Sequence, residues 1–190
     1  MTLTPLIEKA IKTASILHDG QKRRGEKDFP YVTHLFSVAA ILSEHTSDEE
    51  TIVAGILHDS IEDTPYTMKE LEFEFGETVA EIVEGVTEEK SRGGKKLSWR
   101  ERKEGAIEKL KDANRQSLLV ITADKIHNLQ SVVDDYKKHG SLIWNNFNAP
   151  VDEQFWYYRE ILGILEARLD NSIVQKYKAL VLSAERELKK

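Results

Sequence analysis

Hydrophobic residues recur at intervals of three and four along almost the whole chain. Near the start, the apolar positions between residues 3 and 17 fall on one face of a helix that has Pro5 in its first turn. The same spacing predicts further helices over residues 33–44, 48–63, 67–76, 79–86, 98–112, 115–138, 152–169 and 171–188. No stretch alternates with the period of two that a half-buried strand requires, so the predicted fold class is all-α.

Local signals mark where several of these helices begin. Thr67 with Glu70, and Ser98 with Glu101, each form the capping-box pattern that satisfies the first backbone N–H groups of a helix. Polar, non-periodic connectors separate the helices over residues 18–30, 88–97 and 140–150. The middle connector contains Gly93-Gly94, and we expect it to be a mobile loop.

Composition narrows the class of protein. The chain has 190 residues, of which 40% are hydrophobic and 32% charged, which is typical of one globular domain over residues 1–190. Lys and Arg number 27 against 33 Asp and Glu, a net charge of -6 that argues against binding of a nucleic-acid backbone. Glu8, Lys9 and Lys12 interrupt the first helix, and no apolar run is long enough to cross a bilayer. We therefore expect a cytoplasmic protein that contacts neither nucleic acid nor membrane.

The end of the predicted helix over residues 48–63 carries an unusual concentration of acids. Asp59, Glu62 and Asp63 stand at positions i, i+3 and i+4 with no Lys or Arg within a turn. Like charges at this spacing repel by about 0.2–0.5 kcal/mol per pair, and a divalent cation would convert the repulsion into coordination. The neighbouring His58 favours a metal site, although an acidic, solvated helix end is a common alternative.

Two further positions are candidates for the same chemistry. Asp124, His127 and Asn128 share one helix face and interrupt an apolar run, so a buried Asp124 needs a partner. That partner is either a metal ion or a neighbouring group such as the Asn128 amide or Lys125. His34 stands at the start of a helix, where a histidine is more often a structural hydrogen-bonding group than a ligand. Since the chain has no cysteine, His, Asp and Glu are its only strong metal ligands.

Basic residues gather in two connectors. Arg23 and Arg24 lie in the short cluster over residues 21–25, and Lys90 begins a longer basic segment over residues 90–103. Both segments are candidates for binding an anionic ligand, and the alternative for each is a solvated surface.

Taken in order, these motifs resemble those of one family. The residues that carry the resemblance are His18-x-Gly20-Gln21-x-Arg23, Pro30-Tyr31-x-x-His34, His58-Asp59-x-x-Glu62-Asp63-Thr64, Phe75-Gly76, Val86-Thr87 and Ala123-Asp124-Lys125-x-His127-Asn128. They resemble the HD superfamily of metal-dependent phosphohydrolases and, within it, the RelA/SpoT alarmone hydrolase domain in its small, single-domain form of the metazoan SpoT homologue type. The resemblance covers about residues 6–165, and the helices over about residues 152–188 are expected to pack on this core. Six ordered motifs are far more specific than a single His-Asp pair.

The resemblance implies an all-helical enzyme with one divalent cation, Mn²⁺, that removes the 3′-pyrophosphate of the small nucleotide (p)ppGpp to give GDP or GTP and pyrophosphate. The metal ligands that it implies are His34, His58, Asp59 and Asp124. Glu62 and Asp63 would position the attacking water and accept its proton. Imidazole and carboxylate ligands suit several metals, so Mn²⁺ is implied by the family alone.

The resemblance also assigns the substrate contacts. Arg23 corresponds to the arginine that stacks on guanine, with Arg24 beside it. Asn128 and Ser131 would contact the sugar or the phosphates, and Lys90 would hold the 5′-diphosphate.

Two positions depart from the pattern of the family, and two alternative functions stay open. Gln130 stands where the long enzymes carry an arginine, and Leu35 replaces a frequent proline. Because stacking on an arginine tolerates any purine, the alternatives are an HD phosphohydrolase that acts on another nucleotide such as (p)ppApp, and a non-catalytic nucleotide-binding HD module. A chain of 190 residues is also expected to lack the synthetase domain of the long enzymes.

Overall fold

The computed structural model describes residues 2–23 and 29–189, and its all-α fold confirms the predicted class. The α-helices are α1 (Pro5–Leu17), α2 (Val32–Ser43), α3 (Glu49–Leu57), α4 (Ser60–Asp63), α5 (Met68–Phe75), α6 (Glu77–Val86), α7 (Trp99–Asp112), α8 (Arg115–His139), α9 (Val151–Arg168) and α10 (Ser172–Leu188). Among the described helices, none combines the length and the apolar character needed to cross a bilayer.

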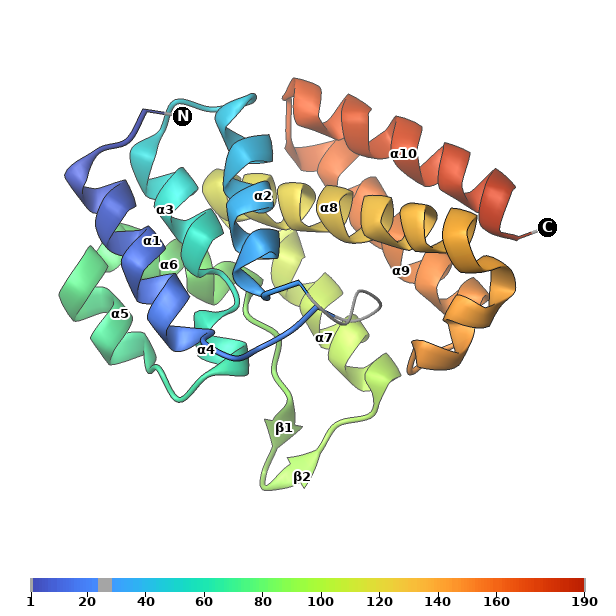
Figure 1. Ribbon diagram of the computed structural model, residues 1–190, viewed down its shortest axis with the longest axis horizontal. Coiled ribbons are helices and arrows are strands. Elements are labelled where there is room, and N and C mark those ends of the chain that lie inside the picture. The colour runs from blue at the N-terminus through green and yellow to red at the C-terminus, as the bar shows by residue number, and fades with distance from the viewer. Residues whose placement is uncertain (1, 24–28, 190) are drawn as a thin grey trace.

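Helix α8 runs through the middle of the molecule (Figure 1). It packs against α2, α3 and α6 from the first half of the chain, and against α9 and α10 that follow it. Residues 117–124 of α8 are buried on every side, which explains the apolar run in the sequence. The helix therefore carries Asp124, the last residue of this run, into the interior of the fold.

Helix starts follow the predicted caps. The Thr67 and Ser98 side chains each accept a hydrogen bond from the backbone three residues on, and the acidic partners of both capping boxes bond back to the cap. Thr4 caps α1, with Pro5 at its first position. Each of these devices joins residues close in sequence, so local pattern was sufficient to predict them.

The predicted helix over residues 48–63 is interrupted. Helix α3 ends at Leu57, His58 lies at its C-cap, and Asp59 is the N-cap of the separate short helix α4, which begins at Ser60. All residues of α3 from Thr51 to Leu57 are buried, so the interruption occurs inside the molecule. The break turns the chain where the acidic cluster begins, and the expectation of one continuous helix was wrong here.

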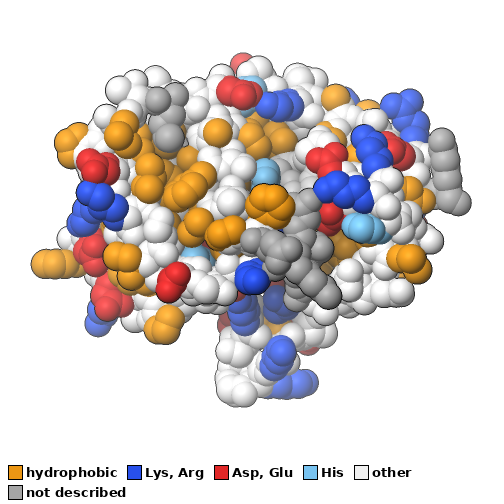
Figure 2. All heavy atoms as spheres, in the orientation of Figure 1, with side chains coloured by type: hydrophobic (Ala, Val, Ile, Leu, Met, Phe, Trp, Pro, Cys, Tyr) orange, Lys and Arg blue, Asp and Glu red, His pale blue; other side chains and the backbone are white. Residues whose placement is uncertain are grey.

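Two connectors have more structure than predicted. In the segment 88–97, β1 (Ser91–Arg92) and β2 (Lys95–Lys96) pair as an antiparallel hairpin rather than forming an irregular loop. Gly93 and Gly94 both have positive φ, which a two-residue hairpin turn requires. The hairpin projects from the helical body, and Figure 2 shows basic side chains gathered on this projection. In the connector after α8, residues Gly140–Asn146 form the 3₁₀ helix η1, which packs against α8.

Candidate metal centre and the adjoining cavity

The break between α3 and α4 presents His58 with a defined tautomer. Its Nδ1 donates a hydrogen bond to the Gly55 carbonyl oxygen at 2.9 Å, one turn earlier in α3. In the neutral ring, the proton on Nδ1 leaves the lone pair on Nε2. This buried Nε2 has no hydrogen-bond partner among the described residues, although it lies 3.1 Å from Asp59 Oδ2. A buried, oriented nitrogen of this kind is suited to metal coordination.

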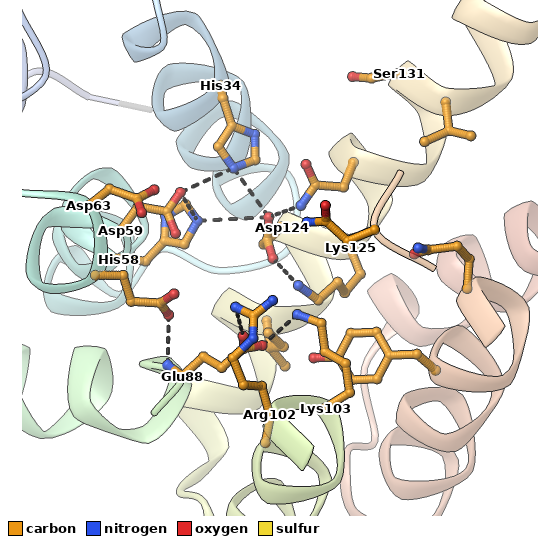
Figure 3. A pocket seen from close by; sticks show the side chains of 18 of the residues that line it. His34, His58, Asp59, Asp63, Glu88, Arg102, Lys103, Asp124, Lys125 and Ser131 are labelled. Atoms are coloured by element: carbon orange, nitrogen blue, oxygen red, sulfur yellow. Dashed lines mark hydrogen bonds and ion pairs between the residues drawn. The ribbon is translucent and has the colours of Figure 1, made fainter. Parts of the chain in front are cut away.

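Four predicted ligands converge from three parts of the chain. Ligand atoms of His34 in α2, His58 and Asp59 lie within 4.8 Å of one another. Asp124 Oδ1 from α8 lies 3.2 Å from His34 Nε2 and 3.8 Å from His58 Nε2, and Asp59 Oδ2 lies 3.6 Å from His34 Nε2. Figure 3 shows these side chains pointing toward one another.

The spacing of these atoms fits one metal ion. Two ligand atoms that each lie about 2.1 Å from an ion, at right angles, are about 3 Å apart. The two shortest separations in the cluster are 3.1 and 3.2 Å. Two imidazoles and two carboxylates also balance the charge of a divalent cation and suit Mn²⁺, Fe²⁺ or Zn²⁺. The cluster can therefore hold a divalent transition metal.

His127 contacts the ring nitrogen of His34 that does not face the cluster. The Nδ1 atoms of the two rings lie 2.8 Å apart, so one must donate and the other accept. Burial and the neighbouring His34 lower the pKa of His127 to about 4, which keeps its ring neutral and able to accept. His34 then donates from Nδ1 and keeps its Nε2 lone pair directed at the cluster.

The two carboxylates have their own supporting groups. The Tyr31 hydroxyl donates to Asp59 Oδ2 at 2.6 Å. Lys125 donates to Asp124 Oδ2 at 2.6 Å, and the Asn128 amide donates to Asp124 Oδ1. Both partners that the sequence offered for Asp124 are thus used, and its Oδ1 still faces the two histidines. Burial opposes ionisation of Asp124, but Lys125 and the histidines outweigh it and hold the pKa of the carboxyl well below its usual range.

The predicted catalytic acids lie next to the cluster and are held by the base of the hairpin. Glu62 Oε1 accepts a hydrogen bond from the Glu88 backbone N–H at 2.7 Å. Burial and the charge of Asp59 raise the pKa of Glu62 to about 7. Lys90 Nζ donates to Asp63 Oδ1 at 2.7 Å and to the Glu62 carbonyl oxygen at 2.6 Å. A carboxyl with a pKa near 7 is well matched to proton transfer at neutral pH.

A cavity of about 930 Å³ extends from the cluster to η1 and the residues after it. Beside the metal ligands, its floor contains a nearly buried Glu88 held by Arg102 at 2.7 Å and by Lys103. Lys103 and Lys125 both lie over the ring of Tyr157. The cavity is therefore large enough for a nucleotide-sized ligand, and Arg102 and Lys103, two cations that share one carboxylate, line it.

Arg23 lies along the cavity on the α8 side. Its Nη2 donates to Asn128 Oδ1 at 3.1 Å and contacts Ser131 Oγ at 3.5 Å. Arg23, Asn128 and Ser131, three of the predicted substrate contacts, thus lie together. Lys90 lies instead beside Glu62 and Asp63. Arg24 lies outside the described residues.

Sequence reasoning assigned no individual role to Tyr31 or Glu88, and it offered Lys125 only as an alternative partner for Asp124. Tyr31 and Lys125 both stand inside quoted motifs, which is the signal that could have identified them. Lys125 supports the adjacent ligand Asp124, whereas Tyr31 supports Asp59, 28 residues further on. Glu88 carries no comparable signal, because its partners lie elsewhere in the chain.

The fold is thus all-α and encloses a buried cluster of His and Asp side chains that could hold a metal ion. Residues 4–151 match the HD domain family, and the chain belongs to this family.

Individual relatives narrow the comparison. The chain is 38% identical over 131 residues to guanosine-3′,5′-bis(diphosphate) 3′-pyrophosphohydrolase MESH1 of Danio rerio, covering 68% of this chain and 70% of the relative. It is 37% identical over 132 residues to the bifunctional (p)ppGpp synthase/hydrolase SpoT of Escherichia coli strain K12, covering 66% of this chain but only 18% of SpoT. A solved metazoan orthologue of SpoT, described as hydrolysing ppGpp, superposes with a TM-score of 0.76 at 25% identity, over 98% of this chain and 97% of that structure.

Proposed function

We propose that this protein is a metal-dependent 3′-pyrophosphohydrolase that converts (p)ppGpp to GDP or GTP and pyrophosphate. The observation that carries the proposal is the convergence of His34, His58, Asp59 and Asp124 beside Glu62, a carboxyl whose pKa is raised to about 7. The relatives MESH1 and SpoT, whose names include this activity, support the choice of substrate.

The cofactor that we propose is one Mn²⁺ ion, held by the two imidazole Nε2 atoms, Asp59 Oδ2 and Asp124 Oδ1. The chemistry that such a cation supplies is polarisation of a phosphate oxygen and a lowered pKa for water. The choice of manganese rests on resemblance to the family, because the ligands suit several metals.

The reaction joins the oxygen of water to the phosphorus attached to ribose O3′, breaks the bond between that phosphorus and O3′, and returns a proton to O3′. Glu62, with a pKa raised by burial and by Asp59, accepts the water proton. Asp63 is anchored by Lys90 and orients the water by accepting its second hydrogen bond. In this scheme Lys90 holds Asp63 in place, and the exposed side of the Lys90 ammonium faces the cavity.

Arg23 presents its guanidinium to the purine base, and Arg24 follows it in the same connector. Arg102 and Lys103 share the single carboxylate of Glu88, and the positive charge left over would offset part of the charge of the phosphates. We also propose a cytoplasmic location, as expected from the sequence.

The decisive experiment measures pyrophosphate release from ppGpp by the purified, Mn²⁺-loaded protein, with ppApp as a parallel substrate. Wild type should release pyrophosphate, and Glu62→Gln should lower kcat by at least about 100-fold, since general-base catalysis contributes about 10²–10⁴-fold. Mn²⁺ content should stay unchanged in Glu62→Gln. The exposed acid Glu72, changed to Gln, is the matched control and should leave kcat within about twofold.

Other outcomes would overturn the proposal in distinct ways. No release from either nucleotide, with metal bound, would favour a non-catalytic binding module. Release from ppApp alone would keep the hydrolase and reject the guanine substrate.

A further inference from the structure

Asn128 connects two parts of the cavity that have separate tasks. Its amide Nδ2 donates to Asp124 Oδ1, the oxygen that faces His34 and His58. Its Oδ1 accepts from Arg23 Nη2 at 3.1 Å. One side chain therefore bridges a predicted metal ligand and the predicted base-stacking arginine.

The orientation of this amide is fixed by its neighbours. A flipped amide would direct Oδ1 at the Asp124 carboxylate and the NH₂ group at the Arg23 guanidinium, so acceptor would face acceptor and donor would face donor. Only the observed orientation satisfies both charged partners. Both ends of the Asn128 side chain are thus engaged within the protein.

Arg23 is held by one edge of its guanidinium. Nη2 points at Asn128 and toward Ser131 Oγ at 3.5 Å, while the guanidinium carbon lies 5.9 Å from the centre of the Tyr31 ring. The backbone N–H of Arg23 also donates to the Phe29 carbonyl at 3.2 Å. Because hydrogen bonds to a guanidinium lie in its plane, this anchoring leaves a flat face for a purine.

We infer that Asn128 is a positioning residue that couples occupancy of the base pocket to occupancy of the metal centre. This inference rests on the proposed function, since it assumes that a purine stacks on Arg23 and that a cation binds at Asp124. A base that immobilises Arg23 fixes the amide, and the fixed amide holds Asp124 with its remaining Oδ1 lone pair toward the cation. By linkage, a bound cation strengthens nucleotide binding by the same factor.

Through-space electrostatics gives the opposite sign, which makes the inference testable. The positive charge of Arg23 repels a cation, so removing that charge would strengthen metal binding if nothing else connected the two sites. If Asn128 transmits the coupling, removing Arg23 releases the amide and weakens metal binding instead.

The experiment titrates Mn²⁺ into the protein with and without saturating GDP, with free Mn²⁺ measured by electron paramagnetic resonance. GDP lacks the 3′-pyrophosphate, and its own binding of Mn²⁺ is corrected from a titration without protein. In wild type we expect GDP to tighten Mn²⁺ binding by about tenfold, within the range typical of coupled sites. In Asn128→Ala the factor should fall close to one. Ser131→Ala, which removes the other Arg23 contact without touching Asp124, should keep the coupling factor.

Arg23→Ala interrupts the bridge at the end remote from the metal. Without nucleotide, this variant should bind Mn²⁺ a few-fold more weakly than wild type, so it tests the inference even if Asn128→Ala folds poorly. Coupling that persists in Asn128→Ala, or tighter Mn²⁺ binding by Arg23→Ala, would overturn the inference. Independent binding of GDP and Mn²⁺ to wild type would also overturn it while leaving the proposed function intact. Failure to bind either ligand would instead count against the proposed function.

Discussion

Changing Tyr31 to phenylalanine removes one hydroxyl group that supports the candidate metal centre. That hydroxyl donates to Asp59 Oδ2 at 2.6 Å, and the Asp59 side chain is only 17% exposed. The phenylalanine ring can keep its stacking on His18, whose ring centre lies 5.2 Å away. The change therefore removes a hydrogen bond while preserving the packing around it.

The size of the effect follows from the charge of the acceptor. A hydrogen bond to a charged group contributes about 1.5–3 kcal/mol, which corresponds to about 10- to 150-fold in a binding constant. Supporting contacts of metal ligands typically change metal affinity by about 10- to 100-fold, in agreement with this range. We therefore expect Tyr31→Phe to weaken Mn²⁺ binding by at least about tenfold.

Isothermal titration of metal-free protein with Mn²⁺ measures this difference directly. The matched control is Tyr177→Phe in α10, which removes a buried hydroxyl that donates to the Tyr158 carbonyl oxygen of α9 at 3.0 Å. The control should lower the melting temperature and leave Mn²⁺ affinity unchanged. A Tyr31→Phe protein with Mn²⁺ affinity within twofold of wild type would refute the role of this hydroxyl.

Three further predictions test other contacts. Lys90→Met should lower kcat for ppGpp more than it raises KM, because the ammonium holds Asp63 at 2.7 Å; a rise in KM alone would indicate a direct phosphate contact. Gly85→Ala should lower the free energy of unfolding by about 1–3 kcal/mol, since its Cβ would lie 2.3 Å from Ser117 Oγ, whereas Gly163→Ala meets no atom within 4 Å and should not destabilise. Chelation of divalent cations should lower the melting temperature and added Mn²⁺ should restore it, because a bound cation stabilises only the folded protein; an unchanged melting temperature would contradict this.

The local sequence pattern was sufficient to predict the helices, but it did not predict the break between α3 and α4. The capping boxes at Thr67 and Ser98 depend on residues three apart, so the pattern contains the whole interaction. The break between Leu57 and Ser60 is different, because the residues around it keep helical spacing. The pattern there cannot show that the buried end of α3 meets α2 and α8, where His58 and Asp59 face His34 and Asp124.

The candidate site was likewise predictable only in part: its metal ligands were predicted, and most of the contacts that support them were not. The order of the motifs, through the family that they resemble, predicted His34, His58, Asp59 and Asp124 as the ligands of one site. The structure places these side chains within a few ångströms of one another. The supporting contacts join positions 28 residues apart for Tyr31 and Asp59, 27 for Lys90 and Asp63, and 93 for His34 and His127. Their partners are brought close only by the packing of the helices, which a single sequence does not encode in any local spacing.

The continuity of α8 limits how this protein can vary in length. Asp124 and Ser131 lie on one uninterrupted helix, so about 10 Å of rigid backbone separates the metal end of the cavity from the Arg23 contacts. One inserted residue between them would rotate everything that follows by about 100° and turn Ser131 away from the cavity. Homologous proteins that share this cavity should therefore differ in this stretch by substitution, and insertions should be confined to connectors such as the tip of the β1–β2 hairpin.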